Sequence, residues 1–201
     1  MQSLLETDVA DDPFVQFNTW WEDAEKSELD EINAMTLATA SKAGIPAARI
    51  VLLKSVTDAG FVFFTNYNSA KGKELEENPH ACLVFFWKEL ERQVRISGKV
   101  EKVSAVESNA YFNSRPRGSR IGAWASPQSS IIAFREIIEN NIAEYMKQFG
   151  GGNIARPPHW GGYIVIPTVI EFWQGRPNRL HDRIQYTKLA AGGWKRERLA
   201  P

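Results

Sequence analysis

The sequence predicts a mainly β fold with packed helices, an α+β protein whose strands are largely antiparallel. Apolar or alternating runs of strand length recur about eight or nine times, and several are joined by turns short enough for hairpins. Helical patterns interrupt these runs instead of alternating with them. This order favours a closed or nearly closed barrel with packed helices over a doubly wound sheet. We see no internal repeat and no clear boundary, so residues 1–201 are expected to form a single domain.

A helix is expected to open the ordered part of the chain. Asp12 can cap its first turn with a carboxylate, and Pro13 suits the first helical position. Apolar residues from Phe14 onward recur near helical spacing, which predicts an amphipathic helix to about residue 29. Residues 1–12 are short and acidic, and we expect them to form a flexible N-terminal segment.

The remaining elements follow from changes in the period of the apolar residues. Helical patterns cover residues 70–77, capped by Asn68 or Ser69, and residues 105–113 and 128–149. An irregular loop rich in Arg and Gly is expected at residues 114–127, and a flexible linker at 150–158. β-Branched, aromatic or alternating runs predict strands at residues 35–40, 47–54, 61–65, 80–87, 91–103 with a bend at Gly98, 161–166, 168–173, 184–188 and 194–199.

Charge and cysteine content limit the kind of protein this can be. The net charge is zero, but residues 1–32 hold ten of the 24 acidic residues and one of the 24 basic ones. Residues 113–130 contain three Arg and no acid, and residues 176–183 contain three Arg and one Asp. Localised Arg without overall basicity suits a small anionic ligand better than nucleic acid. One cysteine and no membrane-length apolar run favour a cytoplasmic protein that does not bind membranes.

Several common chemistries have no support in the sequence. Gly150-Gly-Gly152 follows a helix and precedes a loop, so it does not fit the dinucleotide-binding fingerprint. His80, His159 and His181 lie far apart without metal-ligand spacing, so we expect no metal site. No Ser stands in a nucleophile elbow, and the one Cys lies in an apolar strand, so covalent hydrolysis is not indicated.

Four polar stretches remain as candidates for a binding site. Residues 64–71 place polar side chains and a Lys at the N-terminus of a predicted helix. This arrangement suits phosphate binding and equally suits a plain N-cap. Residues 111–119, continuing to 128–129, combine Arg with hydroxyl groups, and here we favour phosphate binding. Residues 171–183 combine Trp, His and three Arg, and we favour a planar, phosphorylated ligand over a surface turn. In residues 49–54, charged strand ends that point into solvent are slightly favoured over a site.

These stretches resemble the pyridoxine/pyridoxamine 5′-phosphate oxidase family of FMN enzymes. The resemblance follows the family order over roughly residues 15–201. It is carried by Arg-Ile-Val-Leu-Leu-Lys (49–54), Phe-Phe-Thr-Asn (63–66), Glu-Glu-Asn-Pro (76–79), Glu-Arg-Gln-Val-Arg (91–95), Tyr-Phe-Asn-Ser-Arg-Pro (111–116), Ile-Gly-Ala-Trp-Ala-Ser-Pro-Gln-Ser-Ser (121–130), Glu-Phe-Trp-Gln-Gly (171–175), Arg-Leu-His-Asp-Arg (179–183) and Arg-Leu-Ala-Pro (198–201).

The resemblance implies a split β-barrel homodimer with two FMN sites at the interface. The reaction it implies is oxidation of pyridoxamine or pyridoxine 5′-phosphate by dioxygen, giving pyridoxal 5′-phosphate and hydrogen peroxide. Arg179 and His181 would lie near the reacting carbon as catalytic residues. The implied FMN contacts are Arg49, Ile50, Lys54, Thr65, Lys71, Gln93, Gln128, Ser129, Trp173 and Arg183. The implied substrate contacts are Lys54, Tyr111, Arg115, Ser119, Arg179 and His181.

One departure from the family pattern bears on the cofactor. The family usually has Arg-Lys where this chain has Ala70-Lys71. We therefore expect weaker FMN binding, because a lost charge-assisted contact is worth about 1.5–3 kcal/mol. Arg176 matches no family role and is expected to be surface charge. Two alternative functions stay open: a split-barrel FMN reductase or oxidase with another substrate, and a non-catalytic pyridoxal phosphate-binding module.

Overall fold

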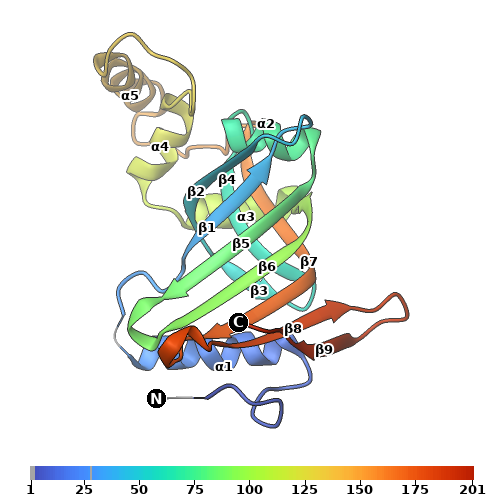
Figure 1. Ribbon diagram of the computed structural model, residues 1–201. Helices are drawn as coiled ribbons and strands as arrows, with labels where there is room; N and C mark the ends of the chain where they lie inside the picture. Colours follow the sequence, from blue (N-terminus) through green and yellow to red (C-terminus); the bar gives the residue numbers. More distant parts are fainter. Residues whose placement is uncertain (1–2, 28) are drawn as a thin grey trace.

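In the part of the chain that the structure describes, nine strands form one curled antiparallel sheet (Figure 1). The structure is a computed structural model that describes residues 3–27 and 29–201. Within this part of the chain the strand order is β2-β1-β5-β6-β7-β4-β3, and β8 pairs with both β7 and β9. The strands are β1 (Ala34–Ala40), β2 (Pro46–Leu52), β3 (Ser55–Thr57), β4 (Gly60–Asn66), β5 (His80–Trp87), β6 (Arg92–Lys102), β7 (Trp160–Gln174), β8 (Asp182–Lys188) and β9 (Trp194–Arg198). The predicted mainly β, antiparallel architecture is confirmed, and the short strand β3 was missed.

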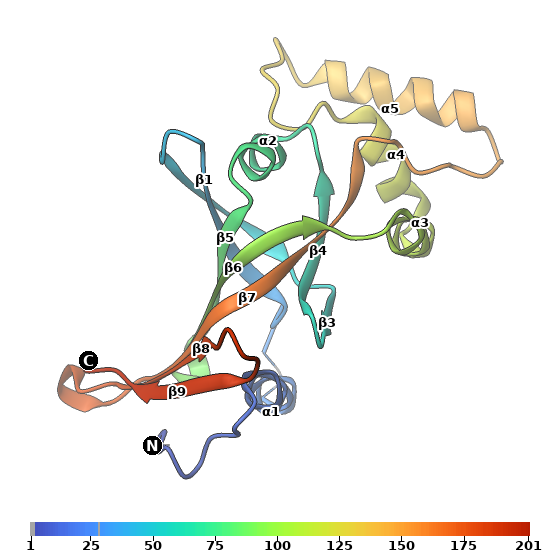
Figure 2. The ribbon, with the colours of Figure 1, turned by 90° about the vertical axis from the view of Figure 1, so that its right-hand side faces the viewer.

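Helix α1 (Pro13–Lys26) closes the lower end of the curled sheet (Figures 1 and 2). As predicted, Asp12 caps it, and its carboxylate accepts a hydrogen bond of 2.7 Å from the N–H of Phe14. Phe17, Trp20 and Ala24 are buried on one face of the helix, at the spacing that places them on a common stripe. These side chains enter the main core, which is rich in aromatic rings from the sheet. No helix of the described chain is long and apolar enough to cross a membrane.

Strand β7 is one continuous strand, whereas the sequence predicted two. The two predicted strands, residues 161–166 and 168–173, left out Pro167, and proline cannot donate a hydrogen bond to a neighbouring strand. The pairing register between β6 and β7 shifts at Ser97/Gly98, and Gly98 lies opposite Pro167. A bulge is one of the few places where a sheet accepts proline. A Cβ atom on Gly98 would lie 2.0 Å from the carbonyl oxygen of Ile166, which explains the glycine at the predicted bend.

The other α-helices lie toward the end of the sheet opposite to α1 (Figure 1). They are α2 (Ala70–Glu77), α3 (Ala105–Ser114), α4 (Arg117–Ala125) and α5 (Glu136–Phe149). The predicted irregular loop at residues 114–127 is wrong, since most of it forms α4. Ile121 and Ala125 are buried one turn apart on this helix, and Ile121 packs in a second core cluster with Phe112, Ile154 and Trp160.

The predicted long helix over residues 128–149 is wrong in its first part. Residues 128–135 form a loop in which Ser129 has a φ of 69°, a left-handed conformation that cannot continue a helix. The apolar residues of this loop therefore do not share a face with those of α5. Ile131 is 102% exposed and Phe134 is 59% exposed. The apolar stripe read from the sequence is divided between a loop and a shorter helix.

Residues 3–12, expected to be flexible, lie along the hairpin of β8 and β9. Leu4 and Val9 are buried. Tyr186 donates a hydrogen bond of 2.6 Å from its hydroxyl to the carbonyl of Ala10, and Arg196 donates one of 3.1 Å to the carbonyl of Val9. This segment has specific contacts with the carboxyl-terminal strands, and its mobility in solution stays a prediction.

Candidate functional site

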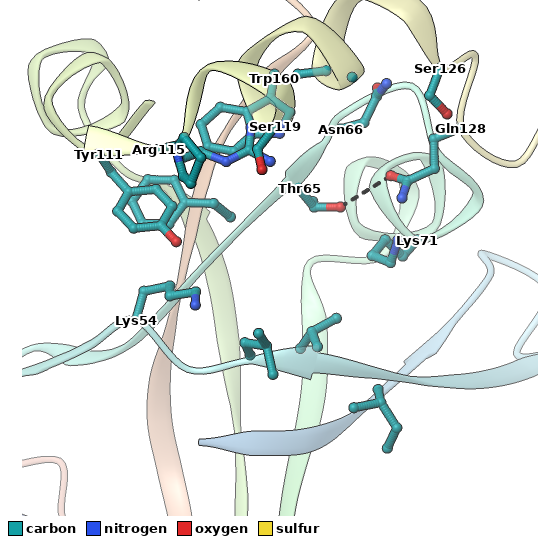
Figure 3. A pocket seen from close by; sticks show the side chains of 17 residues that line it. Lys54, Thr65, Asn66, Lys71, Tyr111, Arg115, Ser119, Ser126, Gln128 and Trp160 are labelled. Carbon is teal, nitrogen blue, oxygen red and sulfur yellow. Dashed lines mark hydrogen bonds between the residues drawn. The ribbon is translucent and has the colours of Figure 1, made fainter. Parts of the chain in front are cut away.

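A cavity of about 640 Å³ opens where β2 and β4 end beneath α3 and α4. It brings together eight of the residues that the sequence marked for FMN or substrate. Figure 3 shows polar side chains on opposite sides of this cavity, with Lys54, Tyr111, Arg115 and Ser119 on one side and Thr65, Lys71 and Gln128 on the other. The eighth, Ile50, also lines it and is 65% exposed.

Arg115 is a half-buried cation on the first side. Its guanidinium carbon lies 4.6 Å from the centre of the Trp160 ring. Its Nη1 atom is buried and has no hydrogen-bond partner in the described chain. Burial lowers the pKa of Arg115. A buried guanidinium nitrogen without an acceptor is costly, so the site suits an anionic ligand that would accept from it.

Aromatic rings form the wall beside Arg115. The rings of Phe64 and Tyr111 stack with centres 4.0 Å apart, and those of Phe64 and Trp160 stack at 5.6 Å. Lys54 lies beyond the end of β2, with its Nζ atom 6.0 Å from the centre of the Tyr111 ring. Three stacked rings are a rigid apolar surface next to two cations. Such a surface suits a flat ring that carries a negative group.

The N-terminus of α2 forms the other side. Ser69 caps this helix, and its hydroxyl accepts a hydrogen bond of 3.3 Å from the N–H of Gly72. Lys71, in the first turn, is 8% exposed, and within the described residues its ammonium group forms no hydrogen bond or ion pair. Burial, with a smaller contribution from nearby Arg49, lowers the pKa of Lys71. A helix N-terminus with a buried lysine is suited to phosphate.

Arg49 and Ser129 are not among the residues that line this cavity. The Arg49 Nη2 atom lies 3.0 Å from the Glu74 carboxylate, and Nη1 donates a hydrogen bond to Thr39. The Thr39 hydroxyl in turn donates to Glu74 at 2.5 Å. The favoured prediction, a charged strand end pointing into solvent, is wrong for Arg49, because a carboxylate and a hydroxyl group hold it against α2.

The other predicted site residues lie on the far end of the sheet. Gln93, Trp173 and Arg183 are neighbours across β6, β7 and β8. Side chains alternate along a strand, so these three share the face opposite to Phe172, whose ring packs on Trp20 of α1. The His181 ring lies 4.6 Å from the Trp173 ring. β8 begins at the same end of the sheet as α1, opposite to α4 (Figures 1 and 2), so one chain does not join the two groups.

Glu171 is a residue of this second group that the sequence analysis missed. Its side chain is 3% exposed and lies between two guanidinium groups, with Arg183 Nε at 2.8 Å and Arg95 Nη2 at 3.1 Å. Arg183 also donates from Nη1 to the carbonyl of Ala200 at 2.9 Å. The hydrogen bond from Arg183 to Glu171 raises the pKa of Arg183. Two fixed acceptors therefore orient a permanently charged guanidinium beside Trp173.

Arg176 is also more than the surface charge that was expected. Its backbone N–H donates to His181 Nδ1 at 3.1 Å, and its side-chain Nε lies 3.5 Å from the Asp182 carboxylate. Because Nδ1 accepts this hydrogen bond, the neutral His181 ring carries its proton on Nε2. No sequence pattern predicts such a backbone contact, because it depends on the conformation of the loop.

The comparisons with known proteins agree with this geometry. Residues 21–149 match a family described as pyridoxamine 5′-phosphate oxidase, and residues 160–201 match the pyridoxine 5′-phosphate oxidase C-terminal dimerisation region. A pyridoxine/pyridoxamine 5′-phosphate oxidase from Synechocystis sp. is 58% identical over 198 residues, which cover 98% of this chain and 92% of the relative.

Two solved structures resemble the chain along almost its whole length. PhzG from Burkholderia lata 383, in complex with tetrahydrophenazine-1-carboxylic acid, is 30% identical with a TM-score of 0.93 and covers 100% of this chain and 99% of its own. A pyridoxamine 5′-phosphate oxidase-related, FMN binding protein from Nostoc punctiforme PCC 73102 is 18% identical with a TM-score of 0.74, and the match covers 94% of this chain and 98% of that one. The similarity to the Nostoc punctiforme protein supports the fold assignment alone. From the match over residues 21–149 and the full-length relative, the chain belongs to the pyridoxamine 5′-phosphate oxidase family.

Proposed function

We propose that the protein uses FMN to oxidise pyridoxamine 5′-phosphate or pyridoxine 5′-phosphate to pyridoxal 5′-phosphate in vitamin B6 synthesis, with dioxygen as the electron acceptor. The observation that carries this proposal is a cavity with two separate cations, the buried Lys71 and the half-buried Arg115, neither of which forms an ion pair within the described chain. FMN and the substrate each combine a planar ring system with one phosphate. The family and the names of its relatives point to the same compounds.

The residues at α2 fit the phosphate of FMN. Lys71 and the N-terminus of α2 would hold it, and Thr65 and Gln128, whose side-chain oxygens lie 3.5 Å apart, line the same side. Ala70 is exposed at the start of the helix and adds no charge, so the expected weaker FMN binding stays a prediction. Bound FMN would supply the redox chemistry by accepting a hydride from C4′ of the substrate.

The reaction balances for both substrates. The amine consumes dioxygen and water and yields the aldehyde, ammonia and hydrogen peroxide. The alcohol consumes dioxygen and yields the aldehyde and hydrogen peroxide. The protein contributes position and charge: Arg115 and Lys54, with Tyr111 and Ser119, would bind the substrate phosphate and so place C4′ for transfer.

Arg179 and His181 would act at the reacting carbon. With Nδ1 occupied by the N–H of Arg176, the His181 ring presents its Nε2–H as a donor toward substrate. Arg179 would add a fixed positive charge next to it. Gln93, Trp173 and Arg183 would contact the flavin from the same face of the sheet.

We propose that two copies of the chain build each site. The cavity and the face that carries Trp173 and His181 lie at opposite ends of one chain, so they can meet only if one comes from each copy. The chain carries the family's C-terminal dimerisation region over residues 160–201, which includes that face. Ile50, at the cavity mouth, and Ile131 and Phe134, in the loop before α5, are exposed apolar side chains of the kind that a partner covers.

Oxygen uptake by the purified protein with added FMN tests the function. We expect uptake with pyridoxamine 5′-phosphate and far less with unphosphorylated pyridoxamine. Arg115→Met should raise KM for the phosphorylated substrate about 10- to 100-fold, because a hydrogen bond to a charged group is lost. Arg135→Met is the matched control, since Arg135 is 87% exposed and pairs with Glu139.

The same assay separates the rival functions. PhzG was solved with a ligand that carries a carboxylate and no phosphate. A split-barrel FMN oxidase with another substrate would act on compounds without phosphate, and Arg115→Met would have no selective effect on phosphorylated ones. A carrier of pyridoxal phosphate would take up no oxygen with either compound. Either result would overturn the proposal.

A further inference from the structure

The segment that carries Arg179 and His181 has a backbone conformation that requires support from contacts with the rest of the protein. Asn178 and Arg179 have φ angles of 58° and 62°, so two consecutive residues other than glycine are left-handed. Such residues persist only when surrounding contacts determine them. The contacts that fix residues 175–181 therefore decide where Arg179 and His181 lie.

Backbone hydrogen bonds fix part of the segment. The N–H of Gly175 donates to the carbonyl of Glu91 at 2.7 Å, and the N–H of Leu180 donates to the carbonyl of Pro177 at 3.2 Å. The N–H of Arg176 reaches the ring of His181 at 3.1 Å. These contacts define the turn, but only the first attaches it to another element.

Asp182 attaches the other end of the segment to the rest of the protein. Its carboxylate lies 3.5 Å from Arg176 Nε and 3.0 Å from Arg198 Nη1, and it accepts a hydrogen bond of 3.2 Å from the N–H of Leu4. The Asp182 side chain is 18% exposed. One carboxylate thus joins the segment, the last strand and the N-terminal residues.

Arg198 extends this connection to the N-terminal segment. Its Nε and Nη2 atoms donate to the two carboxylate oxygens of Glu6 at 2.6 Å and 2.8 Å, and Nη2 also donates to the carbonyl of Leu4 at 2.8 Å. The hydrogen bond from Arg198 lowers the pKa of Glu6 to about 2, so Glu6 is ionised at neutral pH. The Leu4 side chain is 4% exposed and holds this end in place.

We infer that Asp182 and Arg198 are positioning residues for the oxidation. Held by Glu6 and Leu4, they fix Arg176 and therefore the left-handed turn that presents Arg179 and His181. Neither residue lines the cavity, and neither is among the residues expected to contact FMN. The inference deepens the proposed function and rests on it, and it gives residues 4–6 a part in turnover without contact to substrate.

Asp182→Asn is the direct test, because it keeps the shape of the side chain and removes its charge. We expect kcat with pyridoxamine 5′-phosphate to fall about tenfold, since small displacements of catalytic groups reduce turnover strongly. KM and the FMN dissociation constant, measured by flavin fluorescence on the apoprotein, should change by less than about twofold, because the cavity is intact. Arg198→Ala should lower kcat in the same way as Asp182→Asn. Arg198→Lys should recover part of kcat, because it keeps the positive charge.

Glu197→Gln is the matched control. Glu197 lies on the same strand as Arg198 and pairs with Lys195 at 2.7 Å, away from residues 175–182. Its kcat should equal that of the parent. An unchanged kcat for Asp182→Asn would overturn the inference, as would a parallel loss of kcat and FMN affinity, which would indicate a general structural role. The proposed function fails separately, if the parent protein itself does not oxidise the substrate.

Discussion

At the scale of single residues, Lys71 should make FMN binding depend on pH. Its pKa lies below the ordinary value of 10.5 because the side chain is buried. An incoming phosphate would stabilise the charged form and raise this pKa. FMN affinity should therefore be highest below the lowered pKa of the free protein and should fall as pH rises through it, because binding then requires proton uptake. The loss of FMN affinity should begin at a lower pH than it would if the phosphate were bound by an exposed lysine with an ordinary pKa.

Fluorescence quenching of FMN on the apoprotein, measured from about pH 7 to about pH 10, checks this expectation. Lys71→Arg should keep its affinity over the whole range, because a guanidinium stays protonated. Lys71→Met should bind weakly with no dependence in this range. If the parent affinity is as independent of pH as that of Lys71→Met, Lys71 does not bind the phosphate.

The cavity half of the proposed site could be predicted in part from clusters of basic residues in the sequence. Arg115 stands in a run without acids, which favours phosphate from the residue order alone, whereas the stretch with Lys71 suited phosphate and a plain N-cap equally. Glu171 gave no such signal, because a carboxylate in a strand is usually solvated. Its role depends on Arg95 and Arg183 lying beside it on neighbouring strands, which only the pairing register shows.

At the scale of elements, the bulge at Gly98 should control stability. An alanine there would place its Cβ atom 2.0 Å from the carbonyl oxygen of Ile166. Relieving this clash would require the backbone to move, which costs free energy. We expect Gly98→Ala to lower the free energy of unfolding by about 1–3 kcal/mol. For a chain of this size, the melting temperature should fall by about 2–4 °C for each kcal/mol.

Gly118→Ala is the control for this substitution. Gly118 lies in α4, and a Cβ atom added there would have no other atom within 4 Å, so alanine should raise the free energy of unfolding by about 0.5–1 kcal/mol. Thermal unfolding of both variants beside the parent is the measurement. Equal melting temperatures for Gly98→Ala and the parent would show that the bulge is not under steric constraint.

The helices were harder to predict than the strands, for a physical reason. Gly118 and Gly122 lower helix propensity, so residues 117–125 suggest a loop, yet the burial of Ile121 and Ala125 stabilises α4. Conversely, the apolar residues 131–134 continue the pattern of α5 into a loop, where they stay exposed in one chain. Local patterns do not reveal which apolar surface packs within the chain and which is left for a partner.

At the scale of the whole molecule, β7 connects the two halves of the proposed site. Its first part, from Trp160, pairs with β4 beside the cavity, and its last part, near Trp173, pairs with β8. A strand of 15 residues spans about 50 Å, at roughly 3.3 Å for each residue. Sequence motifs identified both halves but gave no information on this separation. The distance between them is the main argument that two chains complete each site.

Mixing two defective variants tests this central claim most directly. Arg115→Met damages the cavity and Arg179→Ala damages the other half, and each variant alone should turn over slowly at substrate concentrations below the raised KM. After subunit exchange at equal amounts, half of the dimers would contain both chains. In each of these dimers one site would carry both substitutions and the other neither, so the account predicts recovery of about a quarter of the parental activity. Activity of the mixture no higher than the mean of the separate variants would contradict a site shared between two copies.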